Sequence, residues 1–157
     1  MPAKTAANIF ISNALAGKPI TPYKQSMHRL MLYTDVVDIC KAFEAYAKHI
    51  LENPPSKKGG SLSHIVNVFW PKPISIIELA NIVRKDVVEC TEGKISPRIE
   101  VIDTGDPVAY RQVGKKTLKV DISKAKDLLG AEVLTSPEKA VERIIKARLC
   151  KLSDVTI

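Results

Sequence analysis

The feature that most constrains the fold is a long amphipathic pattern that begins at Asp35. Its apolar residues recur at helical spacing for about four turns, and Pro54 and Pro55 follow the last of them. This pattern predicts a helix that ends before the two prolines. The composition of the next segment, PPSKKGGSLS, predicts a mobile loop over residues 53–63. The apolar positions of the helix are Val36, Val37, Ile39, Cys40, Phe43, Ala47, Ile50 and Leu51.

Four further segments carry helix signals. One ends at Gly17, and one begins with a capping-box pair, Ser75 and Glu78. A third opens at Asp121 and stops at Gly130. The fourth has Thr135 or Ser136 as its cap and a proline in its first turn. Their sequences are TAANIFISNALAGK, SIIELANIVRKDVVEC, DISKAKDLLGAE and TSPEKAVERIIKARL.

Short apolar runs between these helices predict strands. The runs are PITPY, LMLYT, HIVNVFW, RIEVIDT and TLKV. Short strands between longer helices indicate the α+β class, and 157 residues predict one domain over 1–157. The tail, 150–157, shows no clear pattern.

The composition limits the classes of protein and of partner that fit this chain. Apolar residues make up 45% of the chain, yet no run approaches the ~20 needed to span a membrane, and a signal peptide is not apparent. Three widely spaced cysteines predict neither disulfides nor zinc and suit the reducing cytoplasm. The net charge of +7 favours a polyanionic partner. Because the basic residues are scattered and aromatics are only 5%, the sequence does not favour nucleic acid.

The sequence contains no signature of a nucleotide cofactor site. No strand candidate is followed by a glycine-rich turn of the GxGxxG or GxxxxGK[ST] type. None of the four tyrosines has a lysine four places on. No histidine has a cysteine or carboxylate at ligand spacing, so we predict no metal site.

Four segments, taken in order, resemble one family. They are FISNALAGKPITPY, YTDVVDICKAF, VNVFWPKPISIIELANIV and DISKAKDLLGAEVLTSPEKAV. Together they resemble the C-terminal half of the extended short-chain dehydrogenases/reductases. This family contains the NAD-dependent nucleotide-sugar epimerases and dehydratases, such as UDP-glucose 4-epimerase. The resemblance runs from about Asn8 to Arg148.

The resemblance implies a substrate-binding half that lacks the Rossmann NAD-binding half. Such a half binds the base and diphosphate of a nucleotide sugar, contains no catalytic residue and is inactive alone. NAD would be held by a separate Rossmann-type polypeptide or a missing N-terminal half. We also expect self-association, because the surface that faces the NAD fold in the family is uncovered. The alternative is a diverged interaction module that no longer binds nucleotide sugar.

The resemblance also implies a phosphate-binding arginine ahead of the helix from Asp35. Counting back from Asp35 places His28 at that position, and a shift of one residue restores Arg29. We prefer Arg29 as the phosphate donor because its planar fork is always charged, with His28 as a secondary donor. The alternative is an exposed Arg and His at the start of a strand. The loop before this motif is shorter than in the family and lacks its glycine.

Three further residues are candidates by position. The family expects a second arginine where this chain has Asp103, and Arg111 follows in a longer loop. Arg111 could reach the same phosphates, or it could be an ordinary loop arginine. Thr21 and Tyr23 lie on the strand that runs along the nucleotide base in the family. Core packing is the other role open to Tyr23.

Overall fold

The computed structural model describes residues 5–52, 65–109, 118–129 and 134–153. Their order along the chain is helix, strand, helix, strand and three helices, which confirms the α+β class. The elements are α1 (Ala6–Leu15), β1 (Leu30–Met31), α2 (Val36–Glu52), β2 (Ile74–Ser75), α3 (Ile76–Cys90), α4 (Ser123–Leu129) and α5 (Pro137–Ser153). The loop predicted over 53–63 and the stop at Gly130 lie outside the described residues.

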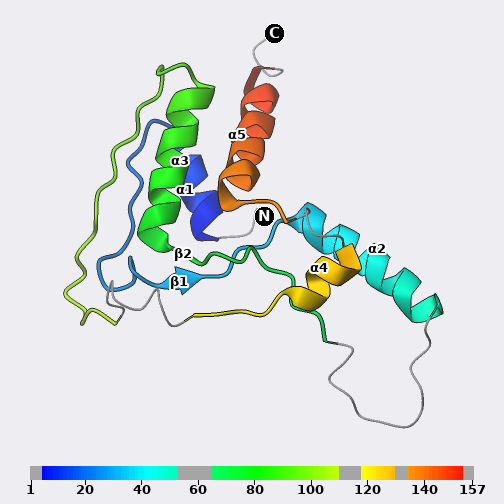
Figure 1. The fold of residues 1–157 in the computed structure, drawn as a ribbon. Helices are drawn as coiled ribbons and strands as arrows, with labels where there is room; N and C mark the ends of the chain where they lie inside the picture. Colours follow the sequence, from blue (N-terminus) through cyan, green and yellow to red (C-terminus); the bar gives the residue numbers. More distant parts are fainter. Residues whose placement is uncertain (1–4, 53–64, 110–117, 130–133, 154–157) are drawn as a thin grey trace.

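The core lies between three helices. Helices α1, α3 and α5 stand side by side, with α3 packed against both of the others (Figure 1). Branched aliphatic side chains fill the space between them and are fully withdrawn from water. They include Ile11 on α1, Leu79, Val83 and Val87 on α3, and Ile145 on α5.

The predicted helix ends at Gly17, Ser75 and Ser136 form, and Thr5 caps α1 without having been predicted. Thr5 Oγ1 accepts from the Asn8 N–H at 3.3 Å, and Gly17 follows α1 with a φ of +68°. In the capping box, the Ser75 N–H donates to Glu78 Oε2 at 2.8 Å, and the Glu78 N–H donates back to Ser75 Oγ at 3.3 Å. Ser136 is the residue that caps α5, accepting from the Lys139 N–H at 3.4 Å.

The strand predictions are confirmed only in part. β1 and β2 form one antiparallel pair, in which Leu30 is opposite Ser75. Residues 65–70 and 118–120, predicted as strands, are not strands. Residues 65–69 make no backbone–backbone hydrogen bond to any described residue. A strand needs a ladder of backbone hydrogen bonds to a neighbour. In the described part, residues 65–70 make only one such bond, from the Trp70 N–H to the Tyr33 carbonyl at 2.7 Å.

The C-terminal prediction needs a similar correction. Helix α5 continues to Ser153, so the first four residues of the predicted tail are helical. Among the residues that the structure describes, no helix is long and apolar enough to cross a membrane.

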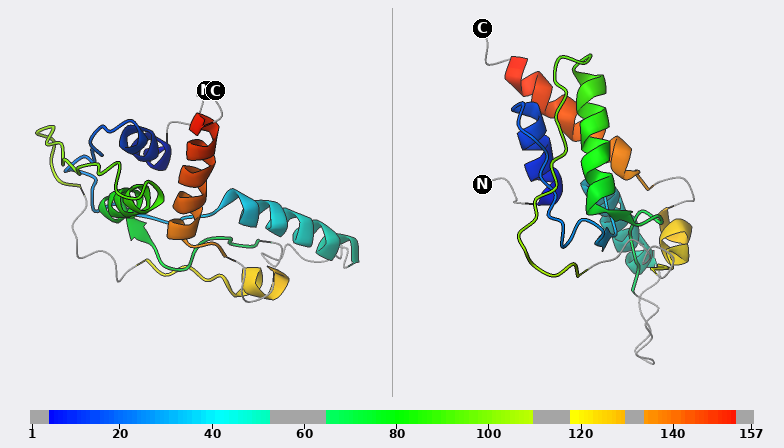
Figure 2. Two further views of the ribbon diagram at one scale, coloured as in Figure 1. Left: turned by 90° about the horizontal axis from the view of Figure 1, so that it is seen from above. Right: turned by 90° about the vertical axis from the view of Figure 1, so that its left-hand side faces the viewer.

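Helix α2 extends away from the three-helix bundle, with α4 alongside it (Figure 2). Two carboxylates fasten the start of α2 to α5 and to the segment just before it. Asp35 accepts from Arg143 Nη2 at 2.7 and 2.6 Å, and Asp38 accepts from the Thr135 N–H at 2.6 Å and from Thr135 Oγ1 at 3.0 Å. Asp35 also accepts from the Val37 N–H at 2.8 Å, which confirms its predicted place at the helix start.

Candidate functional site

The segment that carries Thr21 and Tyr23 runs parallel to residues 98–102. The Ile20 N–H donates to the Arg98 carbonyl at 2.8 Å, and the Lys24 N–H donates to the Ile102 carbonyl at 2.9 Å. Isolated bridges join Ile20 to Ile99 and Tyr23 to Ile102. This is a short parallel ladder rather than two full strands. The ladder holds the backbone of both segments in an extended form.

Side chains on this ladder differ in exposure. Ile20 is fully buried in the core, Thr21 is half-buried, and Tyr23 is 51% exposed. Core packing therefore does not account for Tyr23. An exposed aromatic ring on a fixed backbone can stack on a planar ligand.

A turn carries the chain from the ladder to Arg29. The Ser26 N–H donates to the Tyr23 carbonyl at 3.1 Å, and the Arg29 N–H donates to the Ser26 carbonyl at 2.9 Å. The Arg29 carbonyl accepts from the Ile76 N–H at 3.3 Å, in the first turn of α3. The backbone of Arg29 is therefore held on both sides, while its side chain is exposed. His28 is half-buried beside it.

An ion pair that the sequence did not predict joins the 20–24 segment to Asp103. Lys24 Nζ lies 2.6 Å from Asp103 Oδ2, and the Gly105 N–H donates to Asp103 Oδ1 at 3.0 Å. The hydrogen bond from Lys24, followed by that from Gly105, lowers the pKa of Asp103 below its ordinary value. Because the partners are 79 positions apart in the sequence, no local pattern signals the pair.

Arg111 lies outside the described residues. The described chain closest to it in sequence is Ala109, whose N–H donates to the Gln25 carbonyl at 3.2 Å. The structure places Thr21, Tyr23, His28 and Arg29 along the ladder and the turns that follow it. A binding role for these residues and for Arg111 stays a prediction.

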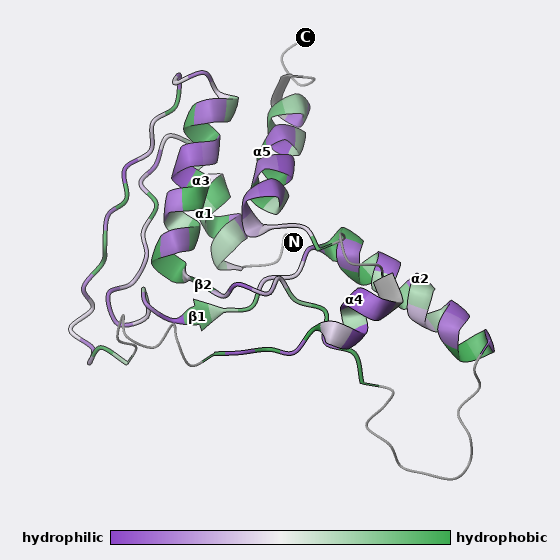
Figure 3. Ribbon diagram, viewed as in Figure 1, coloured by the Kyte–Doolittle hydropathy of each residue, from purple (hydrophilic) through white to green (hydrophobic). Residues whose placement is uncertain are grey.

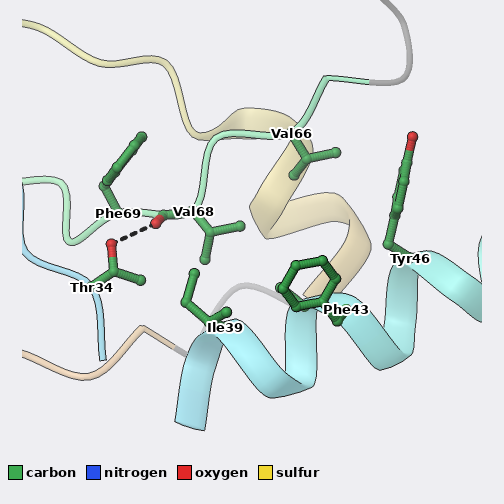
Figure 4. A pocket seen from close by; sticks show the side chains of 8 residues that line it. Thr34, Ile39, Phe43, Tyr46, Val66, Val68 and Phe69 are labelled. Carbon is green, nitrogen blue, oxygen red and sulfur yellow. Dashed lines mark hydrogen bonds between the residues drawn. The ribbon is translucent and has the colours of Figure 1, made fainter. Parts of the chain in front are cut away.

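A separate groove lies between α2 and residues 66–69. It has a volume of about 350 Å³ and an almost wholly apolar lining. Ile39, Phe43 and Tyr46 approach it from α2, and Val66 and Val68 approach it from above (Figure 4). The hydroxyl of Thr34 donates to the Val68 carbonyl at 2.8 Å and fixes one end. With no cation in its lining, this groove does not suit a diphosphate.

Metal chemistry has no support in the part of the chain that the structure describes. No group of three or more histidine, cysteine or carboxylate side chains lies there close enough together to hold an ion. The three cysteines, Cys40, Cys90 and Cys150, form no disulfide.

No protein-family model matches the chain, and no curated protein matches it. Solved structures do. A mutant UDP-glucuronic acid 4-epimerase from Bacillus cereus, in complex with UDP-4-deoxy-4-fluoro-glucuronic acid and NAD, superposes with a TM-score of 0.58 at 20% identity. It covers 92% of this chain, which corresponds to 40% of the epimerase.

The enzyme WbmF from Bordetella bronchiseptica is similar in two structures. The complex with NADH gives a TM-score of 0.60 at 21% identity and covers 97% of this chain and 38% of that chain. The complex with NAD+ gives 0.56 at 20% identity and covers 99% of this chain and 40% of that chain. The chain thus shares the fold of part of these enzymes and spans about two fifths of their length. At the level of the fold, the resemblance predicted from the sequence is confirmed.

Proposed function

We propose that this chain is the nucleotide-sugar-binding portion of an NAD-dependent epimerase or dehydratase, and that it needs a separate NAD-binding fold for turnover. The observation that carries the proposal is the arrangement around the 20–24 ladder. An exposed aromatic side chain, Tyr23, and an exposed guanidinium, Arg29, lie at the two ends of one hydrogen-bonded turn. A base needs a planar surface and a diphosphate needs a fixed cation.

In this proposal each residue has a distinct task. The backbone of Thr21 lies along the base, and Tyr23 stacks or packs against it. Arg29 offers two parallel N–H groups to the diphosphate, and its anchored backbone limits the entropy lost on binding. His28 adds a second donor when it is protonated.

One observation favours the alternative, a diverged interaction module without a ligand. Where the family expects a second arginine, this chain has Asp103, and its carboxylate is already engaged by Lys24 and Gly105. The pair neutralises the cation next to Tyr23. A diphosphate would therefore meet less positive charge here than Lys24 alone would supply.

A ligand screen separates the two functions. UDP- and GDP-sugars would be added one at a time while the melting temperature is followed. A rise well above the scatter of buffer controls, growing with ligand concentration, supports the nucleotide-sugar site, because a ligand that binds the native state stabilises it. Flat curves with every sugar support the interaction module instead.

Substitution of Arg29 tests the site itself. We expect Arg29→Ala to weaken binding of the sugar found in the screen more than tenfold, because a charge-assisted bond is worth about 1.5–3 kcal/mol. Arg29→Lys should recover only part, since an ammonium lacks the fork. Arg111→Ala should cost less than Arg29→Ala, because Gly105 and Gly114 flank it in the sequence and ordering such a segment costs entropy.

The matched control is Arg84→Ala, an exposed arginine on α3 outside the 20–29 segment. Calorimetry on all four variants gives the affinities. Unchanged binding by Arg29→Ala would show that the chosen register is wrong and would make His28 the residue to replace next.

A further inference from the structure

A carboxylate of this chain already binds the cation that follows Tyr23. Lys24 Nζ lies 2.6 Å from Asp103 Oδ2, and both side chains are about half exposed. The Lys24 N–H donates to the carbonyl of Ile102, the residue before Asp103, at 2.9 Å. The two segments of the ladder run side by side next to α3, and both carry hydrophilic residues (Figure 3). The ladder therefore fixes where the two side chains of the pair meet.

This pair differs from the other lysine ion pairs in the described part of the chain. The others join residues that are two or four positions apart: Lys48–Glu44, Lys85–Glu89, Lys94–Glu92 and Lys146–Glu142. Pairs at a spacing of four support the surface of one helix. Lys24 and Asp103 are 79 positions apart, so their pair attaches one segment to another.

Asp103 begins a short turn with a second carboxylate, and we call residues 103–106 the acidic turn. The Gly105 N–H donates to Asp103 Oδ1 at 3.0 Å, and Thr104 Oγ1 donates to Asp106 Oδ2 at 2.7 Å. Gln25 Nε2 donates to Asp106 Oδ2 at 3.5 Å. All four residues of the turn are exposed, so the burial of apolar surface contributes little to its position.

The contacts of the acidic turn with residues 24 and 25 are weak ones. An exposed ion pair contributes little to stability, because water solvates both partners well when they separate. Gln25 Oε1 is buried and has no hydrogen-bond partner among the described residues, so the closed turn leaves one acceptor unsatisfied. Separating the turn from Lys24 therefore costs little.

We propose that the acidic turn is an internal counter-ion, which holds Lys24 while no ligand is bound and is displaced by the diphosphate of a nucleotide sugar. This inference deepens the proposed function and rests on it for the nature of the ligand. An ammonium has three N–H donors, and charge-assisted bonds to phosphate oxygens are strong. Two consecutive turns, 23–26 and 26–29, connect Lys24 to Arg29. Once released, Lys24 is a second cation for the diphosphate.

In this arrangement Asp103 lowers the affinity of the site. Asp103→Asn leaves Lys24 without a counter-ion to give up, and the ligand no longer meets a carboxylate there. We expect pyrophosphate to bind Asp103→Asn about three- to tenfold more tightly than the wild type, since an exposed pair and one nearby like charge each have a modest effect. Lys24→Met should weaken binding by a similar factor.

The experiment titrates inorganic pyrophosphate into four proteins and follows the amide NMR signals of residues 23–29. The proteins are the wild type, Asp103→Asn, Lys24→Met and the double variant. The gain from Asp103→Asn should disappear in the Lys24→Met background, because no cation remains to be released. Asp127→Asn, which removes the same charge from an exposed acid on α4, is the control and should bind as the wild type does. No gain from Asp103→Asn, or an equal gain without Lys24, would overturn the proposal.

Nucleotide sugars, applied to the same four proteins, separate a failure of this inference from a failure of the proposed function. If a UDP- or GDP-sugar raises the melting temperature of all four equally, the nucleotide-sugar site is supported and the counter-ion is contradicted. If no sugar binds, but pyrophosphate still distinguishes Asp103→Asn through Lys24, the counter-ion is supported and the proposed function is contradicted.

Discussion

Asp86 is the residue whose charge is least well accommodated. It lies on α3 with 6% exposure, and its Oδ2 has no hydrogen-bond partner in the structure. Burial, followed by the nearby charge of Glu89, raises its pKa from 3.8 to about 6, and Glu142 and Glu138 of α5 add smaller increments that Lys85 opposes. At neutral pH the native state therefore contains a poorly solvated carboxylate.

The raised pKa of Asp86 predicts the direction in which stability changes with pH. A native state that binds the proton more tightly than the unfolded chain gains stability as the proton binds. The contribution is full below about pH 4 and is lost as pH rises through about 6. We expect the free energy of unfolding, measured by urea titration, to increase as pH falls from 7.5 to 5. Below that range the exposed carboxylates with lowered pKa, such as Asp103, lose their ion pairs and reverse the trend.

Asp86→Ala isolates this effect. It removes the buried charge and improves helix propensity, so we expect it to stabilise the chain at pH 7.5 by about 1 kcal/mol and to flatten the dependence between pH 7.5 and 5. Asp127→Ala, at an exposed acid on α4, is the control and should retain the wild-type slope. If the free energy of unfolding of Asp86→Ala keeps the wild-type dependence on pH, a group other than Asp86 causes that dependence.

At the scale of elements, the helices follow from the sequence and the strands follow only in part. The capping box at Ser75 and the stop at Gly17 are local signals, and both appear where the sequence predicts them. Strands depend on pairing with distant segments. Residues 65–70 have the composition of a strand but make a single backbone–backbone hydrogen bond to the described part, from Trp70 to Tyr33. The 20–24 segment, in contrast, is extended because residues 98–102 lie beside it.

In the candidate site too, some residues could be predicted from the sequence and others could not. Arg29 and Tyr23 could be proposed from a motif, because the matched segments are continuous in the sequence. The Lys24–Asp103 pair, across 79 positions, could not. The same applies to Asp38 and Thr135, which meet across 97 positions.

The Asp38–Thr135 contact joins α2 to the segment that leads into α5 and can be tested. Asp38→Ala would leave the Thr135 N–H without its acceptor, and we expect a loss of about 1–3 kcal/mol in the free energy of unfolding. Thr135→Val removes only the hydroxyl donor and should cost less. Asp38→Asn retains one acceptor oxygen and should fall between Asp38→Ala and the wild type. Equal stability of Asp38→Ala and the wild type by urea titration at pH 7.5 would show that the contact does not fasten α2.

At the scale of the whole molecule, the chain combines a complete core with an uncovered periphery. Helices α1, α3 and α5 enclose a closed apolar core, and α2 extends beyond it with exposed apolar side chains that include Val36, Phe43 and Leu51 (Figure 2). Solved structures with the same fold are about two and a half times as long, since the chain matches about 40% of each. The core explains why this portion can fold.

The lack of cofactor motifs in the sequence leads to an expectation about NAD binding and turnover. We expect the chain alone to neither bind NAD nor turn over a nucleotide sugar. The sequence has no glycine-rich turn to approach a pyrophosphate and no tyrosine followed at the fourth position by lysine. In the described part, the sheet is one antiparallel pair of two-residue strands, which offers no carboxyl edge of parallel strands for a dinucleotide.

Titration of the chain into NADH should leave the nicotinamide fluorescence unchanged. UDP-sugars incubated with the chain and NAD should return unaltered by chromatography. Product formation above that of a heat-denatured sample would contradict the prediction and would require a catalytic group that neither the motifs nor the described residues indicate.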